Sequence, residues 1–228
     1  MCFPEGKRVT DTLVVRMVVR TTKTIGACHT QGIDEVLSKS KQKASCIMGK
    51  KITVITGSPR KKGNSFALAH AFIEEARDGG CEVECFDAAD LMVGGCRACG
   101  ACFSKGDPCV FDDDFNAIAR SIQEADVVVF ASPLYWYSFT AQIKPVIDRL
   151  YSFFASDTDV SGKDYILLCC CEEEDVAAMD GVRIPLEKSA ALLKWANGGM
   201  VLVPGVAEIG DIDKTDALNQ ARELARKF

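Results

Sequence analysis

Four closely spaced cysteines are the residues of this chain with the clearest potential for chemistry. Cys96, Cys99, Cys102 and Cys109 form the pattern C-x2-C-x2-C-x6-C. Thiolates two residues apart on a tight turn can point at one centre, and four of them complete the ligand shell of a zinc ion or a [4Fe–4S] cluster. A ferredoxin motif is not matched, because the last gap is long and Pro108 precedes the fourth cysteine. A cluster, a zinc or thiol-redox site, and simple packing of reduced thiols all stay open.

A second candidate site is the stretch Gly57–Ser65, GSPRKKGNS, which follows a short apolar run. Hydroxyl, amide and guanidinium groups suit a phosphate that must be held from several sides, and the free N–H groups of a following helix add to them. A Walker loop is excluded because Gly63 is followed by Asn64 rather than lysine, and G-x-G-x-x-G is also missing. We therefore expect a terminal monophosphate, bound by Ser58, Arg60, Asn64 and Ser65.

A third feature is a group of three adjacent aromatic residues, Tyr135, Trp136 and Tyr137. They follow the continuous apolar run of residues 126–132. Their flat faces and polar tips suit a planar ring. In a parallel sheet, the loops after neighbouring strands line the same crevice, so these aromatic residues and the phosphate loop are expected to face each other.

The elements that must position these residues alternate between strand and helix. We expect strands over residues 52–56, 81–86, 126–132, 164–170 and 200–206. Helices are expected after a cap at Asn64 or Ser65, over 112–124, around 143–150, over 186–196 and at the C-terminus. Such alternation predicts a doubly wound parallel sheet covered on both faces. The pattern leaves the flavodoxin-like and Rossmann strand orders open, and the loops must decide between them.

The loop GSPRKKGNS resembles the phosphate loop of the NADPH-dependent FMN reductase group within the flavodoxin-like superfamily. The later segment resembles the same family's pattern S-P-x-Y-W followed by K-x-x-x-D-R. The resemblance spans about residues 49–206 and implies a three-layer, five-stranded fold of order 2-1-3-4-5. It also implies that Ser58, Arg60, Asn64 and Ser65 hold the FMN phosphate, and that Pro133, Leu134, Tyr135 and Trp136 cradle the isoalloxazine. We interpret Lys144, Asp148 and Arg149 as structural or as part of a subunit interface.

The cysteine loop resembles the compact motif of the iron–sulfur flavoproteins, a branch of the same superfamily. It follows the second expected strand, at the edge of the sheet where FMN is expected, so a [4Fe–4S] cluster there would form an electron relay with the flavin. One departure from the family pattern is the acidic run Cys171–Asp175 after the fourth strand. We interpret it as a solvated turn and assign it no flavin contact.

Composition and charge limit the classes of function. The 228 residues are 48% apolar with a formal net charge of −5, so nucleic acid is not expected as a main partner. No stretch approaches the roughly 18 consecutive apolar residues of a membrane helix, and the first residues lack the apolar run of a signal peptide. We therefore expect a cytoplasmic protein without a membrane partner. Reduced cytosolic thiols make a disulfide framework a poor explanation of the 12 cysteines.

Residues 1–47 differ from the rest of the chain. They hold eight Lys or Arg against four Asp or Glu and show no clean period after Val19. Met48 is followed at once by the first motif-bearing stretch, GKKITVITGSPR. We interpret residues 1–47 as a disordered extension or as lying upstream of the native start, and residues 48–228 as the flavodoxin-like, FMN-binding domain.

Together these features predict an FMN-dependent NAD(P)H oxidoreductase. Hydride passes from a nicotinamide nucleotide to the flavin and on to a small acceptor such as a quinone or free flavin. No side chain is assigned as catalytic, because the flavin supplies the chemistry. Two alternatives stay open: an iron–sulfur flavoprotein with a ferredoxin-like electron donor, and a flavin-free zinc or thiol sensing module. The resemblance further implies a homodimer or homotetramer.

Overall fold

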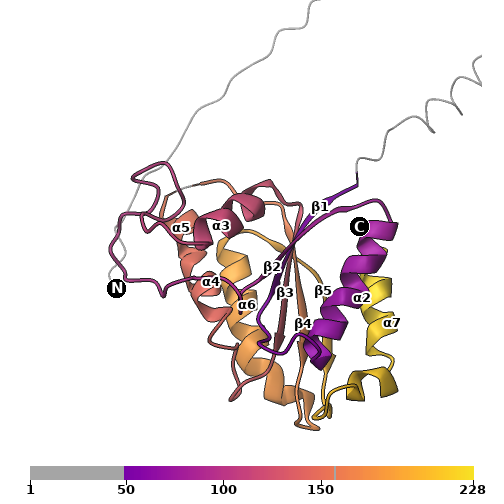
Figure 1. Ribbon diagram of the computed structural model, residues 1–228. Coiled ribbons are helices and arrows are strands. Elements are labelled where there is room, and N and C mark those ends of the chain that lie inside the picture. The colour runs from indigo at the N-terminus through magenta and orange to yellow at the C-terminus, as the bar shows by residue number, and fades with distance from the viewer. Residues whose placement is uncertain (1–48, 157) are drawn as a thin grey trace, which may run out of the picture. The chain divides into compact units, whose positions relative to one another are not determined.

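A five-stranded parallel sheet of order β2-β1-β3-β4-β5 forms the centre of the fold (Figure 1). This computed structural model describes residues 49–156 and 158–228, so the predicted extension over 1–47 lies outside the described residues. The predicted strand order is confirmed. The strands are β1 (Lys51–Thr56), β2 (Glu82–Asp87), β3 (Val127–Pro133), β4 (Asp164–Cys170) and β5 (Ala196–Val203).

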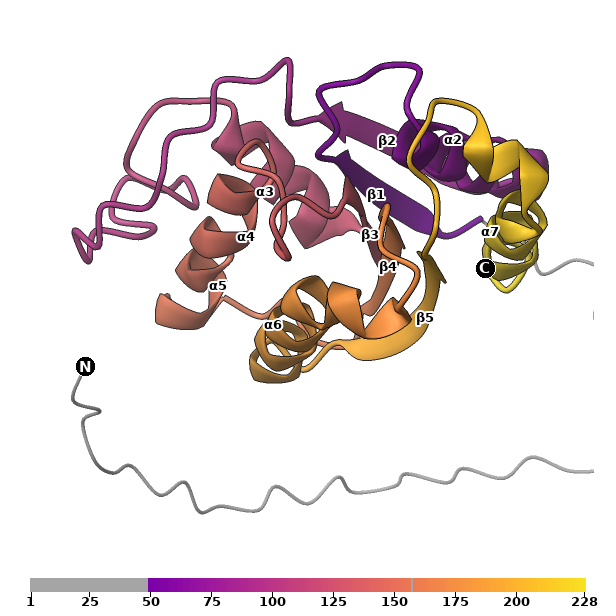
Figure 2. The ribbon, with the colours of Figure 1, turned by 90° about the horizontal axis from the view of Figure 1, so that it is seen from below.

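Helices cover both faces of the sheet, and Figure 2 shows the sheet with a layer of helices on either side. One face carries α2 (Asn64–Asp78) and α7 (Ala217–Ala225). The other carries α3 (Phe115–Glu124), α4 (Lys144–Arg149), α5 (Tyr151–Ala155) and α6 (Asp180–Leu192). Short 3-10 helices span Val176–Met179 and Asp211–Lys214. Over the described residues, none of the helices has the length and apolar character needed to cross a membrane.

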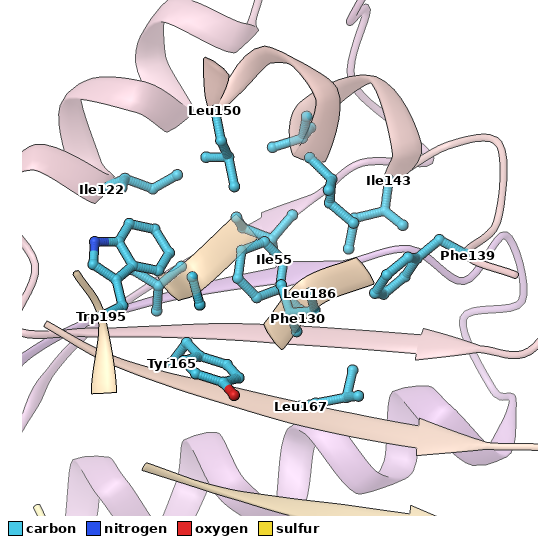
Figure 3. Packing of buried hydrophobic residues seen from close by; sticks show 14 of the residues in the cluster. Ile55, Ile122, Phe130, Phe139, Ile143, Leu150, Tyr165, Leu167, Leu186 and Trp195 are labelled. Atoms are coloured by element: carbon cyan, nitrogen blue, oxygen red, sulfur yellow. The ribbon is translucent and has the colours of Figure 1, made fainter. Parts of the chain in front are cut away.

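The hydrophobic core is split into two layers by the sheet. Ile55, Phe130 and Leu167 face the layer under α3 to α6, where they meet helix residues such as Ile143 and Leu186 (Figure 3). Their chain neighbours point the other way and pack under α2 and α7. This arrangement explains the continuous apolar run of β3, because a central strand covered on both faces buries every side chain.

Two predicted boundaries are wrong around α6 and β5. The helix predicted over 186–196 spans Asp180–Leu192 and contains Pro185. The strand predicted over 200–206 spans Ala196–Val203, so the Gly198-Gly199 pair lies inside β5. At Gly199, where φ is +142°, a Cβ atom would lie 2.4 Å from a methyl group of Leu224. The glycine is therefore required by the close approach of α7 rather than by the end of a helix.

Two helix starts also differ from the prediction. The helix predicted from residue 112 begins at Phe115, and the backbone N–H of Phe115 donates to Oδ1 of Asp113 at 3.2 Å. The helix after the phosphate loop is capped by Gly63, not by Asn64 or Ser65. The side chains of Asn64 and Ser65 are consequently available for other contacts.

Candidate functional site

A cavity of about 440 Å³ opens at the carboxyl edge of the sheet, between the loops that follow β1 and β3. This edge collects the ends of all parallel strands, and the β1/β3 pair is the point where the strand order reverses. The volume is in the range of small-molecule and cofactor sites. The structure brings all eight residues predicted for FMN to its wall: Ser58, Arg60, Asn64, Ser65, Pro133, Leu134, Tyr135 and Trp136.

The loop after β1 is turned back on itself by short hydrogen bonds. Ser58 Oγ accepts from the backbone N–H of Arg60 at 3.1 Å and donates to the Arg60 carbonyl at 3.2 Å. The same carbonyl accepts from the N–H of Gly63 at 3.0 Å. The Arg60 side chain is exposed and makes no ion pair within residues 49–156 and 158–228. A cation and the start of the 15-residue helix α2 therefore face the cavity together, which suits an anion.

The side-chain amide of Asn64 is hydrogen-bonded within the protein. Its Nδ2 donates to the carbonyl of Glu208 at 2.9 Å, and its Oδ1 accepts from the N–H groups of Gly210 at 3.0 Å and Ile212 at 3.4 Å. The amide is thus engaged by the loop after β5, although Asn64 still lines the cavity. Its structural contribution is to hold that loop in place.

The aromatic loop after β3 forms a tight reverse turn. Tyr135 and Ser138 exchange two backbone hydrogen bonds of 3.0 Å, while Trp136 and Tyr137 between them have φ values of +49° and +59°. Two central residues with positive φ define a type I′ turn, which side chains other than glycine adopt only at a cost of about 1–3 kcal/mol each. The turn leaves Trp136 94% exposed at the rim. Strain of this kind is concentrated at ligand sites.

Close packing ties this turn to its surroundings. Thr140 Oγ1 donates to the carbonyl of Gly57 at 2.6 Å and so links the aromatic segment to the loop after β1. On the other side, Tyr137 donates from its hydroxyl to Glu173 Oε1 at 2.9 Å, which raises the pKa of the phenol. A Cβ atom on Gly181 would lie only 1.8 Å from the Tyr137 carbonyl oxygen. The start of α6 can therefore support the turn only because residue 181 is glycine.

Sequence reasoning missed the part of the wall that follows β4 and β5. Cys170 ends β4, and burial followed by the influence of Cys171 raises the pKa of its thiol to about 12, so it stays protonated. The acidic run interpreted as a solvated turn also contributes to the wall. The topology rule for parallel strands was the signal that could have identified these residues. The missed lining residues are Cys170, Cys171, Glu172, Val206, Ala207 and Ile209.

The four clustered cysteines belong to the long loop between β2 and α3. This loop extends outward beside α3 in Figure 2. Positive φ values at Ala98, Gly100, Phe103 and Gly106 turn this loop repeatedly. As a result, four thiols separated by up to 13 residues line one cavity. Its walls also include Arg149, Tyr151 and Ser152, and its cysteines are Cys96, Cys99, Cys102 and Cys109.

The thiols are close enough to influence one another electrostatically. Burial raises the pKa of Cys102, and the negative charge of Cys109, Cys99 and Cys96 raises it further. Deprotonating all four would therefore require a compensating positive centre, which is the chemistry of a metal site. Within the described residues, no three Cys, His, Asp or Glu side chains converge tightly enough to ligate a single ion as they stand.

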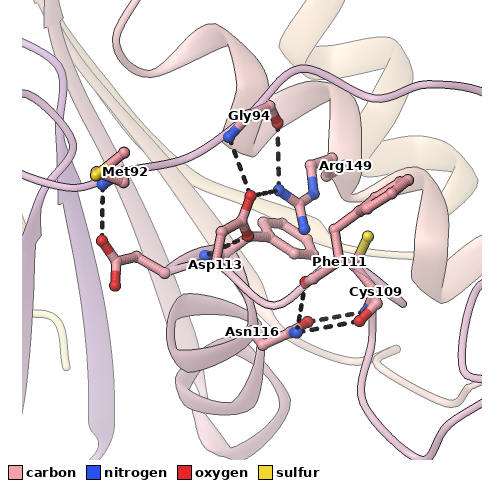
Figure 4. A network of polar contacts seen from close by, with 9 residues as sticks. Met92, Gly94, Cys109, Phe111, Asp113, Asn116 and Arg149 are labelled. Atoms are coloured by element: carbon pink, nitrogen blue, oxygen red, sulfur yellow. Dashed lines mark hydrogen bonds and ion pairs between the residues drawn. The ribbon is translucent and has the colours of Figure 1, made fainter.

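Arg149 lies beside this loop and is only 4% exposed. Its Nη1 donates to Asp113 Oδ2 at 2.5 Å and to the carbonyl of Gly94 at 3.2 Å (Figure 4). Its guanidinium also lies over the ring of Phe115. Burial alone raises the pKa of Asp113, but the hydrogen bonds from Arg149 and from two backbone N–H groups outweigh it and lower that pKa. These contacts fit the structural role predicted for Arg149.

The other two residues of the K-x-x-x-D-R pattern behave differently from Arg149. Lys144 and Asp148 form an exposed i,i+4 pair at 2.6 Å along α4. Pairs of this kind contribute a few tenths of a kcal/mol. They do not line either cavity.

Comparison with known proteins places these two cavities in context. The profile described as NADPH-dependent FMN reductase matches residues 50–170, which is more than half of the chain. The chain belongs to the NADPH-dependent FMN reductase family. It is thus a member of a family of FMN-binding oxidoreductases, and the matched stretch contains the phosphate loop, the cysteine loop and the aromatic turn.

Relatives in the curated collections carry the name iron–sulfur flavoprotein. One from Archaeoglobus fulgidus is 32% identical over 178 residues, which covers 76% of this chain and 78% of the relative. Another, from Methanosarcina thermophila, is 39% identical over 99 residues, covering 43% of this chain and 51% of the relative. The chain therefore matches about half the length of this second relative of the family.

Solved structures confirm the flavodoxin-like fold. An azoreductase from Bacillus anthracis superposes with a TM-score of 0.61 at 19% identity, covering 78% of this chain and 100% of the other. An NAD(P)H:quinone oxidoreductase from Methanothermobacter marburgensis superposes with a TM-score of 0.60 at 18% identity, covering 78% and 96%. At this level of identity the likeness concerns the fold alone.

Proposed function

We propose that this family member is an iron–sulfur flavoprotein that transfers electrons between a small electron-carrier protein and an acceptor. FMN occupies the cavity at the carboxyl edge of the sheet, and a [4Fe–4S] cluster is bound by the four cysteines of the β2–α3 loop. The observation that carries this proposal is that Cys96, Cys99, Cys102 and Cys109 line one cavity although the chain spreads them over 14 residues.

The residues of the larger cavity suit FMN in two parts. Arg60, the buried Ser58 hydroxyl and the start of α2 form the end that suits a phosphate. Pro133, Leu134 and the strained aromatic turn form the end that suits a planar ring. The two ends are joined by the Thr140 contact with Gly57.

The four thiols on the wall of this cavity supply the ligand number of either a zinc ion or a [4Fe–4S] cluster. As placed, the side chains do not converge on one point, so either centre would draw the loop together. The relatives named iron–sulfur flavoprotein favour the cluster over zinc and over a flavin-only reductase.

The two cofactors supply complementary chemistry: a cluster transfers single electrons, and flavin accepts one electron or two. The protein contributes their placement. The segment from Pro133 to Ser152 reaches both cavities, because the end of β3 lines one and the α4–α5 junction lines the other. We expect a ferredoxin-like protein as the electron donor and a homodimer or homotetramer as the working assembly.

The decisive experiment is the absorbance spectrum of protein purified without oxygen, with iron, sulfide and FMN measured on the same sample. We expect flavin bands together with a broad shoulder near about 400 nm that bleaches with dithionite. A colourless protein that takes up neither FMN nor iron would overturn the proposal. Cys99→Ser should remove the shoulder and keep the flavin bands, whereas Cys85→Ser, an exposed cysteine outside the loop, should keep both.

A second candidate function is direct reduction of the flavin by NAD(P)H, which the name of the matched family favours. In that case the cluster would not be needed for flavin reduction. Mixing the oxidised protein with NADH or NADPH under argon separates the two functions. Rapid bleaching of the flavin bands by either nucleotide, also in Cys99→Ser, would favour the reductase. Bleaching only by a reduced ferredoxin would favour the carrier-dependent function.

A further inference from the structure

The α4–α5 junction carries buried polar atoms that neither the fold nor the flavin cavity uses. Arg149 is 4% exposed, and its Nε and Nη2 have no hydrogen-bond partner within the described part of the chain. Ser152 is 3% exposed, and its Oγ is likewise unpartnered there. Burying such donors without partners costs about 1–3 kcal/mol each, and more for a charged group. A folded protein rarely retains three of them so close together without a ligand that accepts their hydrogen bonds.

These donors lie at the wall of the cysteine cavity. Arg149 and Ser152 line it together with the four thiols. The side-chain amide of Asn116 is hydrogen-bonded to the backbone of Cys109 and Phe111. Figure 4 shows that the Cys109 sulfur points away from Asn116, toward the side on which Arg149 lies. Nη1 is held by Asp113 and Gly94, so the remaining edge of the guanidinium is not needed for the ion pair.

We propose that Arg149 is a positioning residue for the cluster, and that its Nε and Nη2, together with the Ser152 hydroxyl, donate hydrogen bonds to the sulfur atoms of the anionic centre in the cysteine cavity. This inference rests on the proposed function. Four thiolates make such a centre negative, and its sulfur atoms provide the acceptors that Nε, Nη2 and the Ser152 hydroxyl lack, because Asp113 and Gly94 engage only Nη1.

The arrangement has a consequence for electron transfer. Reduction adds one electron to the centre, taken from the donor, and forms or breaks no bond to the protein. The added negative charge is stabilised by a fixed cation and by hydrogen bonds to sulfur, so Arg149 raises the reduction potential. Asp113 keeps the guanidinium in place, and the Phe115 ring supports its face at 4.2 Å.

The test is a redox titration of the cluster in the anaerobically purified holoprotein, followed by its absorbance. Arg149→Gln removes the charge and is expected to make reduction at least tenfold less favourable, a fall of about 59 mV for a one-electron couple. Arg149→Lys keeps the charge but lacks the planar guanidinium, so its reduction potential should lie between those of the wild type and Arg149→Gln. Asp113→Asn removes a negative charge beside the centre, while its amide oxygen can still accept from Nη1 and hold the guanidinium, so the cluster potential should not fall. Iron and FMN content are measured for every variant.

Each outcome has a defined meaning. Arg149 variants that hold the cluster at the wild-type potential would overturn the inference and leave the iron–sulfur proposal intact. Wild-type protein without iron would instead overturn the proposed function. Loss of the cluster from Arg149→Gln with FMN retained supports the positioning role.

If the Arg149 variants do not fold, the comparison passes to Ser152→Ala. Its matched control is Ser156→Ala, because the Ser156 hydroxyl already donates to the Ser152 carbonyl at 2.7 Å. A lower cluster potential in Ser152→Ala than in Ser156→Ala supports the inference. Equal potentials in these two variants would overturn it.

Discussion

Asn64 and Gly210 lie 146 residues apart in the chain and are joined by a 3.0 Å hydrogen bond from the Gly210 backbone N–H to Asn64 Oδ1. The same side chain also holds Glu208 and Ile212. One amide at the start of α2 therefore fixes the loop after β5, and that loop forms one wall of the larger cavity.

Asn64→Ala is expected to destabilise the fold. It leaves the N–H groups of Gly210 and Ile212 without their acceptor, which should lower the free energy of unfolding by about 1–3 kcal/mol. Urea unfolding of the FMN-free protein measures this. Asn219→Ala, which removes an exposed amide bonded to Asp216, serves as the control and should change stability little. Equal stability of the two variants would contradict the holding role of Asn64.

Arg60→Ala should weaken FMN binding without affecting the fold. The side chain is exposed and free of ion pairs within the described residues, so the FMN-free protein should unfold as the wild type does. Loss of a charge-assisted contact with the phosphate should raise the Kd for FMN about tenfold to a hundredfold. Fluorescence titration measures the Kd.

The control for Arg60 uses both a second ligand and a second residue. Riboflavin lacks the phosphate, so its affinity should be the same in Arg60→Ala and the wild type. Lys62→Ala removes a charge from the same loop at a position that does not line the cavity, and should leave the Kd for FMN nearly unchanged. Equal losses of affinity for FMN and riboflavin in Arg60→Ala would show that Arg60 does not contact the phosphate.

Gly181→Ala tests the support of the aromatic turn by α6. A Cβ atom 1.8 Å from the Tyr137 carbonyl must displace either the helix or the turn. Overpacking of this kind costs about 1–3 kcal/mol, and the displaced turn should also bind FMN more weakly. Gly95→Ala is the control, because its Cβ would meet no atom within 4 Å. Wild-type stability and FMN affinity in Gly181→Ala would contradict the proposed packing.

Asp113→Asn tests the pH dependence of the Arg149 ion pair. The pKa of Asp113 is lowered in the folded protein, so this carboxylate stabilises the fold above its ordinary pKa of about 3.9 and loses the effect as pH falls through the lowered value. Wild type should therefore be more stable than Asp113→Asn at pH 7, and the difference in their free energies of unfolding should disappear in acid. Urea unfolding at a series of pH values measures this difference. A difference that is equally large at pH 7 and in acid, or the same pH profile for the exposed Asp112→Asn, would contradict the linkage.

Much of the fold and half of the cavity wall follow from local patterns. The apolar run of β3 predicts a strand buried on both faces, and Phe130 and Val129 do pack into opposite core layers. The phosphate loop and the aromatic turn could be predicted because each motif lies within a few residues at the end of a strand. Parallel strands then bring such ends to one edge, as the shared cavity bears out.

Contacts between distant parts of the chain were decided only by the tertiary structure. The engagement of Asn64 by the loop after β5 depends on how α2 and that loop meet in space, and no local pattern encodes it. The same holds for Gly199 under Leu224 and for Arg149 beside the cysteine cavity. Residue types and spacing thus determined which chemical groups this protein can offer. Packing of the helices and loops decided which of those groups are engaged by the protein itself and which stay free for a ligand.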